Sequence, residues 1–363
     1  MAERVKVKVR KKKNKKKKLI KRFILLMLLA LLAVGGVGIY KIYNTISAAD
    51  DTYDQLDRGE KSKLRDEVVD IKKKPFSILF MGVENYATKG ERGRTDSLIV
   101  VTLDPKQKTM KMLSIPRDTR VQLAGDTTGS KTKINAAYGK GGKEETIETV
   151  EDFLGIPIDY YATVDFDGFK DVIDEIGGID VDVPFDFDEK SDVSKTKRIY
   201  FKKGNMHLNG EQALAYARMR KQDKRGDFGR NDRQKQILKA ALDQISKPQN
   251  LAKIDTIAQK ASKNIKTNFR ITQALALQEI YNGFKGDDIK TLSITGQDLN
   301  IAGVYYFEAD EQNLTNVQNE LNHHLFPGST ADSSGTSSDS SDATADGTDS
   351  STDSSTDTSA SSY

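Results

Sequence analysis

The feature that most constrains this chain is a run of 18 residues without a charge, from Phe23 to Tyr40. As a helix this run is about 27 Å long, which is enough to cross the hydrocarbon core of a bilayer. Thirteen Lys and Arg residues against one acid precede it within residues 1–22. Because positive charge stays on the cytoplasmic side, the pattern predicts a single-pass type II cell-membrane protein with a cytoplasmic N-terminus. A signal peptide cleaved near Ala48 and Ala49 is the alternative, although the apolar run is longer than is usual for one.

The remainder of the chain divides by composition. Residues 41–73 are charged and weakly apolar, and we expect them to form an extracellular spacer that leads to a folded domain at 74–327. Residues 328–363 are nearly all Ser, Thr, Asp, Ala and Gly, so we expect a disordered tail. The chain has a net charge of +4, of which residues 1–22 carry about +12 and residues 328–363 carry −7. The stretch 23–327 between them therefore carries only −1. Such a stretch offers no surface for nucleic acid.

Strand-like and helix-like patterns alternate within 74–327. The strands are expected at 76–83, 97–103, 110–115, 161–165, 179–183, 291–294 and 304–307, and the helices at 143–154, 166–176, 210–218, 230–245, 251–264 and 271–284. The second and third strands are expected to pair as a hairpin through Asp104–Gln107. The pattern predicts an α/β domain in which helices sandwich a mixed central β-sheet.

Composition excludes several kinds of chemistry. The chain has no Cys, which rules out disulfides, Cys-ligated zinc, iron–sulfur clusters and thiol nucleophiles. Its three His residues argue against a zinc hydrolase or a His-based triad. Trp is absent, so a stacking platform for sugars would have to consist of Tyr and Phe. Neither GxxxxGK[ST] nor GxGxxG occurs, so we do not expect a nucleotide site.

Arginine is clustered near the expected ends of strands and helices. The residues concerned are Arg94, Arg117, Arg218, Arg220 and Arg230, with Gln234 on the same helical face as Arg230. A planar guanidinium group matches phosphate oxygens, and a diphosphate needs several such groups at once. Each arginine alone is more commonly a surface ion pair. We expect the helix before Arg218 to end near Ala217, because only an extended exit points Arg218 and Arg220 the same way.

Two carboxylates form the counterpart of these arginines. Glu84 follows the first strand and Asp96 precedes the second, so neighbouring strands would place both at one rim of the sheet. Two hard oxygen ligands, completed by phosphate oxygens and waters, suit Mg²⁺ or Mn²⁺ better than zinc. The alternative is that Asp96 caps a turn before its strand.

The order and spacing of six segments resemble the LytR-CpsA-Psr family over residues 76–245. The segments are GVENYATKGERGRTDSLIV, LSIPRDTRV, KINAAYGKGG, VDFDGFKDVIDEIGGIDVDV, LNGEQALAYARMR and DFGRNDRQKQIL. The resemblance implies an α-β-α fold and an enzyme on the surface of a Gram-positive cell. Such an enzyme transfers a glycopolymer (wall teichoic acid, capsule or a related polymer) from undecaprenyl diphosphate to the muramic acid 6-hydroxyl of peptidoglycan, forming a phosphodiester.

The resemblance also implies roles for individual residues. Asp96 and Arg117 would be catalytic, and Glu84 and Asp96 would hold Mg²⁺, at a site where the family usually has Asp in place of Glu84. The diphosphate and the head sugar would bind to Arg94, Arg117, Arg218, Arg220, Arg230 and Gln234. Apolar side chains would form a tunnel for the prenyl tail. Two other functions stay open: a surface pyrophosphatase that uses water as the acceptor, and a non-enzymatic regulator of the cell envelope.

Overall fold

The computed structural model describes residues 52–84, 93–194, 196–251, 253–261, 264–270, 273, 276–277, 279–280 and 289–328. The expected basic segment 1–22, the expected anchor 23–40 and the expected tail beyond residue 328 lie outside these residues. None of the helices that the structure describes is both long enough and apolar enough to cross a membrane.

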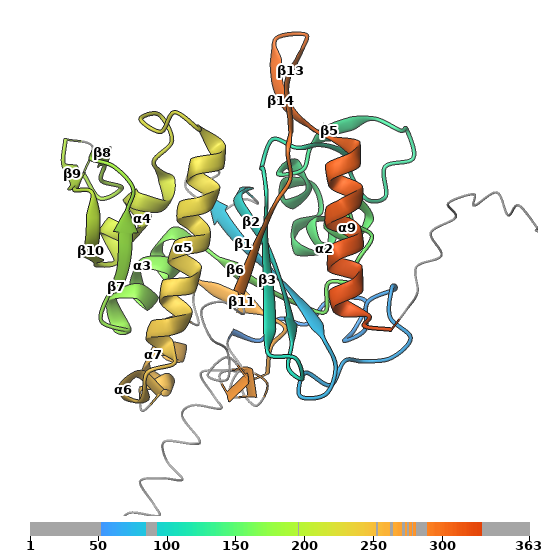
Figure 1. The fold of residues 1–363 in the computed structure, drawn as a ribbon, viewed down its shortest axis with the longest axis horizontal. Helices are drawn as coiled ribbons and strands as arrows, with labels where there is room; N and C mark the ends of the chain where they lie inside the picture. The colour runs from blue at the N-terminus through green and yellow to red at the C-terminus, as the bar shows by residue number, and fades with distance from the viewer. Residues whose placement is uncertain are drawn as a thin grey trace, which may run out of the picture. The chain divides into compact units, whose positions relative to one another are not determined.

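A six-stranded mixed sheet occupies the centre of the domain, in the order β11-β6-β1-β2-β3-β12 (Figure 1). Its strands are β1 (Phe76–Glu84), β2 (Arg94–Asp104), β3 (Thr109–Ile115), β6 (Tyr160–Val164), β11 (Ile265–Thr267) and β12 (Ile289–Ser293). Strands β1, β2 and β3 are antiparallel neighbours, whereas β6 runs parallel to β1 and β12 parallel to β3. The expected hairpin of β2 and β3 is present, since Asp104 pairs with Thr109.

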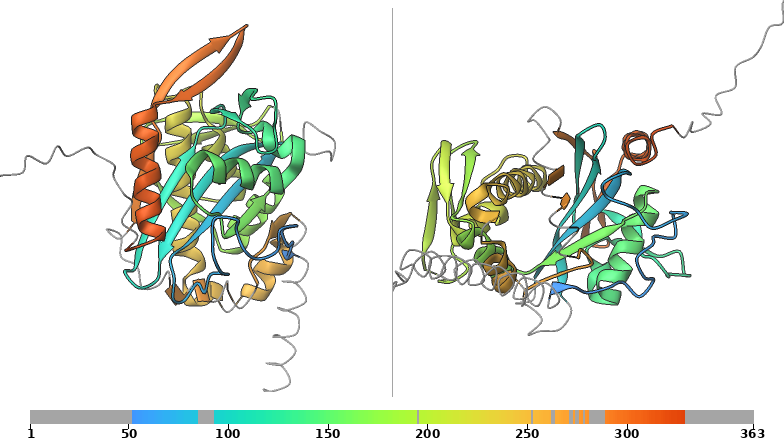
Figure 2. Two further views of the ribbon diagram at one scale, coloured as in Figure 1. Left: turned by 90° about the vertical axis from the view of Figure 1, so that its right-hand side faces the viewer. Right: turned by 90° about the horizontal axis from the view of Figure 1, so that it is seen from below.

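Helices cover both faces of this sheet, which confirms the expected mixed α/β fold. Helices α2 (Ala136–Leu154) and α9 (Glu311–Leu325) lie on one face, and α5 (Asp227–Ile245) lies on the other (Figure 2). Successive residues of β2 point to opposite faces: Leu98 and Val100 join the first core, whereas Ile99 and Val101 join the second. This two-sided burial explains why the sequence of β2 is apolar at consecutive positions.

A third layer packs against the outer side of α5. It consists of α3 (Phe166–Glu175), β7 (Ile179–Val183), β8 (Phe187–Lys190), β9 (Arg198–Phe201), β10 (Gly204–Leu208), α4 (Gly210–Arg218), α6 (Pro248–Leu251) and α7 (Ile254–Ala261). Two further hairpins, β4 (Arg120–Gln122) with β5 (Lys131–Lys133) and β13 (Gly296–Ile301) with β14 (Val304–Ala309), complete the described elements. The β13–β14 hairpin projects from the body of the domain, at the top of Figure 1.

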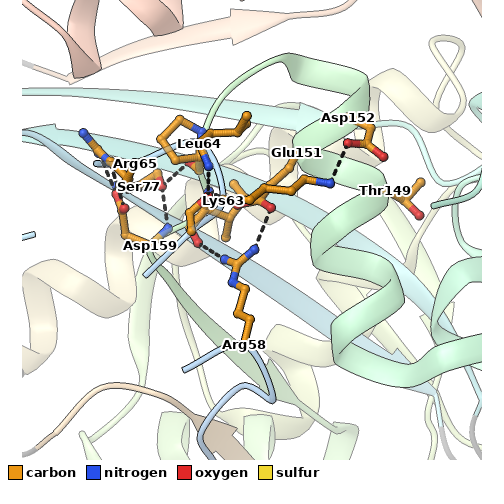
Figure 3. A network of polar contacts seen from close by, with 12 residues as sticks. Arg58, Lys63, Leu64, Arg65, Ser77, Thr149, Glu151, Asp152 and Asp159 are labelled. Atoms are coloured by element: carbon orange, nitrogen blue, oxygen red, sulfur yellow. Dashed lines mark hydrogen bonds and ion pairs between the residues drawn. The ribbon is translucent and has the colours of Figure 1, made fainter. Parts of the chain in front are cut away.

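Residues 56–71, which the sequence assigns to the spacer, pack against the domain. Leu56 is only 4% exposed and belongs to the core beneath α2. The fully buried carboxylate of Glu151 accepts hydrogen bonds from Arg58 Nη1 at 2.6 Å and from Ser62 Oγ at 2.7 Å (Figure 3). The segment is therefore fixed to α2 by a paired buried charge, whose loss from one side would leave the other unsatisfied.

His324 is buried between α9 and the β2–β3 hairpin. Its Nδ1 lies 2.7 Å from Thr102 Oγ1 and its Nε2 lies 2.9 Å from Thr109 Oγ1. Burial, with a smaller contribution from the charge of Lys111, lowers the pKa of His324 to about 4. The imidazole is thus neutral in the folded protein at physiological pH.

This lowered pKa predicts a stability that depends on pH. Between pH 6.5 and pH 4, His324 is protonated in the unfolded chain but neutral in the folded protein. The free energy of unfolding therefore decreases as the pH falls through that range. Titration of His324 should make the free energy of unfolding about 3 kcal/mol smaller at pH 4 than at pH 7. Urea unfolding of the wild type and of His324→Gln at both pH values measures this. The same pH dependence in both proteins would show that His324 does not cause it.

Candidate functional site

A cavity of about 760 Å³ lies between the central sheet and helices α3, α4 and α5. Its apolar wall includes Phe80 and Ile99 from the sheet, Phe169 from α3, Leu214 from α4, and Leu238 and Leu242 from α5. Charged and polar side chains also line it, and seven of them are residues singled out from the sequence: Glu84, Asp96, Arg117, Arg218, Arg220, Arg230 and Gln234. Residues far apart in the chain therefore converge on one space.

Helix α5 explains why one end of the cavity is charged and the rest is apolar. Arg230 and Gln234 lie one turn apart in its N-terminal half, and both face the cavity. The same face continues through Ile237, Leu238 and Ile245 in the following turns. Most of this stripe is only partly buried, because it lines a cavity instead of packing fully into a core. One helix face thus supplies both the polar end and the apolar wall.

A β-bulge in β2 places Asp96 in the site. Gly82 pairs with Ser97 and Val83 pairs with Thr95, so Asp96 is an extra residue without a partner in β1. A bulge of this kind bends the strand and redirects a side chain. Asp96 therefore lies inside β2 and does not cap a preceding turn, the alternative that its sequence position left open.

The two carboxylates of the site interact with each other and with Arg117. Burial, followed by the charge of Asp96 and a hydrogen bond with it, raises the pKa of the Glu84 carboxyl. Asp96 Oδ1 accepts a hydrogen bond of 2.7 Å from Arg117 Nη1. Burial acts to lower the pKa of Arg117, but the hydrogen bond and charge of Asp96 outweigh it and raise that pKa.

Asp227, at the start of α5, holds two further arginines together. Its Oδ1 lies 3.2 Å from Arg220 Nε and 2.8 Å from Arg230 Nη2. Arg230 is only 5% exposed, and its burial lowers its pKa, with Arg117 and Arg220 contributing to the shift in the same direction. Asp227 therefore brings the guanidinium groups of Arg220 and Arg230 together at this end of the cavity.

Several buried polar atoms of the site lack a hydrogen-bond partner among the residues that the structure describes. They are Arg230 Nε and Gln234 Oε1, together with Arg117 Nε, whose nearest carboxylate oxygen, on Asp118, is 3.6 Å away. Buried donors without a partner cost free energy, so a folded protein keeps them where a ligand supplies the acceptor. Guanidinium donors from separate elements suit the oxygens of a phosphate or diphosphate.

The remaining predicted arginines take different positions. Helix α4 ends at Arg218, one residue later than expected, and Met219 follows in an extended conformation with ψ 130°. The Arg218 guanidinium lies over the Phe166 ring, 5.4 Å from its centroid, at the cavity wall. Arg94 pairs with Glu84 across β1 and β2, but it is exposed and does not line the cavity. The role of Arg94 stays a prediction.

The sequence reasoning assigned no role to two residues that organise the site, Asp227 and Arg233, although Arg233 belongs to the arginine cluster that it noted. Asp227 lies three residues before Arg230, a spacing at which opposite charges pair on a helix, and this signal was available. Arg233 is fully buried and donates to the carbonyl oxygens of Tyr216 and Met219, which fixes the end of α4. No pattern distinguishes Arg233 from its functional neighbours before the fold is known.

The carboxylate pair offers hard oxygen donors of the kind that a divalent cation binds. No group of three or more His, Cys, Asp or Glu side chains gathers anywhere in the described part of the chain. Besides burial, which acts most strongly, the charge of Asp96 and a hydrogen bond with it raise the pKa of Glu84, so the neighbouring carboxylate disfavours a second negative charge. A divalent cation relieves this repulsion, and two carboxylates plus substrate oxygens are a usual environment for Mg²⁺. The residues present therefore fit Mg²⁺ or Mn²⁺.

The fold and the site define a class of protein: an α/β domain that can hold an anionic head group by arginines and a long apolar tail in the adjoining cavity. A family comparison agrees with this class. The model of the LytR_cpsA_psr family matches residues 39–323, and the chain belongs to this family.

Similar proteins of known name point to the same chemistry. The polyisoprenyl-teichoic acid–peptidoglycan teichoic acid transferase TagV of Bacillus subtilis (strain 168) is 71% identical over 85% of this chain and 79% of its own length. The crystal structure of B. subtilis TagV has a TM-score of 0.64 at 74% identity, covering 70% of this chain and 98% of that one. A structure of YwtF (TagT), a protein of B. subtilis, contains bound octaprenyl pyrophosphate lipid; its TM-score is 0.59 at 34% identity, covering 75% of this chain and 99% of that one.

Proposed function

We propose that this protein is a membrane-anchored phosphotransferase that attaches a glycopolymer, such as wall teichoic acid or capsule, to peptidoglycan. The donor is the polymer linked to undecaprenyl diphosphate, and the acceptor is the 6-hydroxyl of N-acetylmuramic acid. The observation that carries the proposal is the single cavity, apolar along α5 and lined at one end by arginines from three parts of the fold. The transferase names of the relatives and the lipid in the TagT structure support it.

The reaction asks for charge stabilisation and positioning, which these side chains supply. Arg117 and Arg230 bind the diphosphate oxygens, and the apolar wall holds the prenyl chain. The acceptor oxygen forms a bond to the phosphorus next to the sugar, and the bond from that phosphorus to the bridging oxygen breaks. The lipid leaves as its monophosphate, and the hydroxyl proton passes to solvent. Asp96 is the candidate for influencing that deprotonation. Glu84 and Asp96 would hold Mg²⁺, which supplies Lewis-acid stabilisation of the phosphate charge when bound.

The proposed topology follows the sequence. Residues 1–22 are cytoplasmic, 23–40 form the signal anchor, and the chain after it leads to the extracellular catalytic domain, which includes the packed residues 56–71 and extends to residue 327; the acidic segment 328–363 follows. Near the start of the described chain, Asp54 N donates to Thr267 O of β11 at 2.8 Å. Ile265 of the same strand lines the cavity. The first described residues therefore contact a strand that also lines the apolar cavity.

Transfer to peptidoglycan tests the proposal directly. The full-length protein is supplied with a radiolabelled, lipid-diphosphate-linked saccharide and a soluble peptidoglycan oligomer, with Mg²⁺. We expect a labelled adduct on the oligomer. Release of label into water without an adduct would instead identify a pyrophosphatase, and binding without turnover would identify a regulator.

The raised pKa of Glu84 predicts how pH and Mg²⁺ interact. Mg²⁺ needs the ionised carboxylate, so below that pKa the rate should fall about tenfold per pH unit as one proton competes with the metal. Raising the Mg²⁺ concentration should shift this acidic limb to lower pH. Rate profiles at two Mg²⁺ concentrations measure the shift in the wild type and in Glu84→Gln. A Mg²⁺-independent limb in the wild type would argue against a metal at Glu84.

A further inference from the structure

A small cleft lies beside the charged end of the cavity and has no role in binding the lipid donor as described above. It is lined by Pro116, Asp118, Asp227, Phe228, Asn231, Tyr305 and Phe307. These residues come from the loop that carries Arg117, from the first two turns of α5 and from the β13–β14 hairpin. Asp227 connects the two spaces, since it lines the cleft while its carboxylate pairs with Arg220 and Arg230 of the cavity.

The hairpin is fixed to the loop that carries Arg117. Phe307 N donates to Asp118 O at 2.9 Å, and Thr119 forms an isolated bridge with Phe307. Lys133 pairs with the Asp118 carboxylate at 2.7 Å and lies 5.7 Å from the centroid of the Tyr305 ring. The position of the hairpin is therefore tied to that of Arg117.

The chemistry of the cleft is that of a saccharide site. Phe228 is 40% exposed and packs edge-on against Phe307, with the ring centroids 5.7 Å apart. Aromatic faces stack on the apolar faces of sugar rings, and in a chain without Trp this task falls to Tyr and Phe. Asn231 adds an amide group that can bind a sugar hydroxyl, whereas the Asp118 and Asp227 carboxylates beside it are paired with Lys133 and with Arg220 and Arg230.

The in-line geometry of phosphoryl transfer indicates whether the saccharide bound in this cleft is that of the donor or that of the acceptor. In phosphoryl transfer the attacking and leaving oxygens are roughly in line with the phosphorus. The leaving lipid phosphate continues into the apolar cavity, so the acceptor must approach from the other side of the arginines. The aromatic cleft is next to those arginines through the ion pairs of Asp227, and none of its lining residues lines the cavity.

We propose that this cleft, together with the β13–β14 hairpin, is the binding subsite for the glycan strand of the acceptor. The proposal rests on the transferase function proposed above. Phe228 and Tyr305 stack on sugar rings and hold the strand so that one hydroxyl faces the phosphorus. The exposed Ile301 and Val304 at the hairpin tip extend the contact along the strand.

Kinetics separate an acceptor subsite from a merely structural patch. In the full-length protein, Phe228→Ser should raise the KM for a peptidoglycan oligomer about tenfold, the worth of one good aromatic contact, while the KM for the lipid donor changes less than twofold. Phe228→Tyr keeps the ring and should restore the acceptor KM. Tyr200→Ser, at an equally aromatic but 69% exposed position on β9, is the matched control and should change neither. An unchanged acceptor KM, or an equal rise in both KM values, would overturn the proposal.

Binding can be measured without turnover, because the chain has no Trp. The Phe228→Trp protein contains a single indole at the cleft, and the Tyr200→Trp protein contains one at the control position. A saturable emission change with peptidoglycan oligomer in the first protein alone is the expected result. No change, an equal change in both, or the same change with the lipid-linked saccharide alone would overturn the proposal. If transfer itself fails, this titration still decides whether the cleft binds the glycan.

Discussion

Arg117→Ala should lower the rate of glycopolymer transfer by roughly 10²–10³-fold, the usual cost of losing one donor to the charge of a transition state. Arg117 is the arginine that contacts the carboxylate pair directly, through the 2.7 Å bond from its Nη1 to Asp96. Its buried Nε makes no hydrogen bond to the described residues and has only the Asp118 carboxylate, 3.6 Å away, as an ion-pair partner, so it can donate to a phosphate oxygen. Transfer of labelled saccharide to peptidoglycan oligomer, at equal amounts of folded protein, measures the loss.

The loss of Arg117 should also change the pH dependence. Arg117 helps to lower the pKa of Glu84, so without it that carboxyl keeps its proton to a higher pH and the acidic limb of the rate moves upward. Arg117→Lys keeps the charge but not the planar guanidinium group. It should therefore restore the pH position of the acidic limb more completely than it restores the transfer rate. Arg225→Ala removes an exposed arginine that does not line the cavity and should stay within twofold of the wild type. A normal rate in Arg117→Ala would contradict the proposed site.

Elements with a strong hydrophobic period were predictable from the sequence. Strand β3 and helix α3 were expected within one residue of their observed bounds, because their buried residues recur at strand or helix spacing. The apolar pattern of helix α4 gave its observed bounds, Gly210–Arg218, whereas the argument from the direction of the arginines placed its end one residue too early, near Ala217. The convergence of the arginines was predicted because they lie near the expected ends of these strands and helices.

The parts that escaped prediction depend on long-range contacts. Strands β8 to β11 contain three to five residues each, and such short exposed segments carry too little pattern to distinguish them from loops. Residues 56–71 look polar and extended, yet the buried carboxylate of Glu151, about 90 positions later, fixes them to the domain. The bulge at Asp96 is likewise invisible until β1 supplies the register.

The α4–α5 junction depends on a buried ion pair with strict steric requirements. Arg233 and Asp223 pair at 2.6 Å, with side chains only 2% and 3% exposed. Arg233 also donates to the carbonyl oxygens of Tyr216 and Met219. A Cβ at Gly229 would overlap the Asp223 carboxylate, so a residue without a side chain is required there. These contacts fix the segment from which Arg218 and Arg220 extend toward the cavity.

Arg233→Met should therefore lower the free energy of unfolding by about 3–5 kcal/mol, because it leaves the Asp223 carboxylate buried without its partner. Urea unfolding of the domain measures the loss, which is a large fraction of the stability of an ordinary protein. Adding Asp223→Asn removes the uncompensated charge and should recover part of the loss, whereas Arg233→Lys keeps the charge but cannot reach both carbonyls. Full stability in Arg233→Met would mean that this junction is held by its apolar contacts alone. The transfer rate per folded molecule should fall as well. Arg233 fixes the backbone at Met219, between Arg218 and Arg220, so without it these two cavity arginines are no longer held in position.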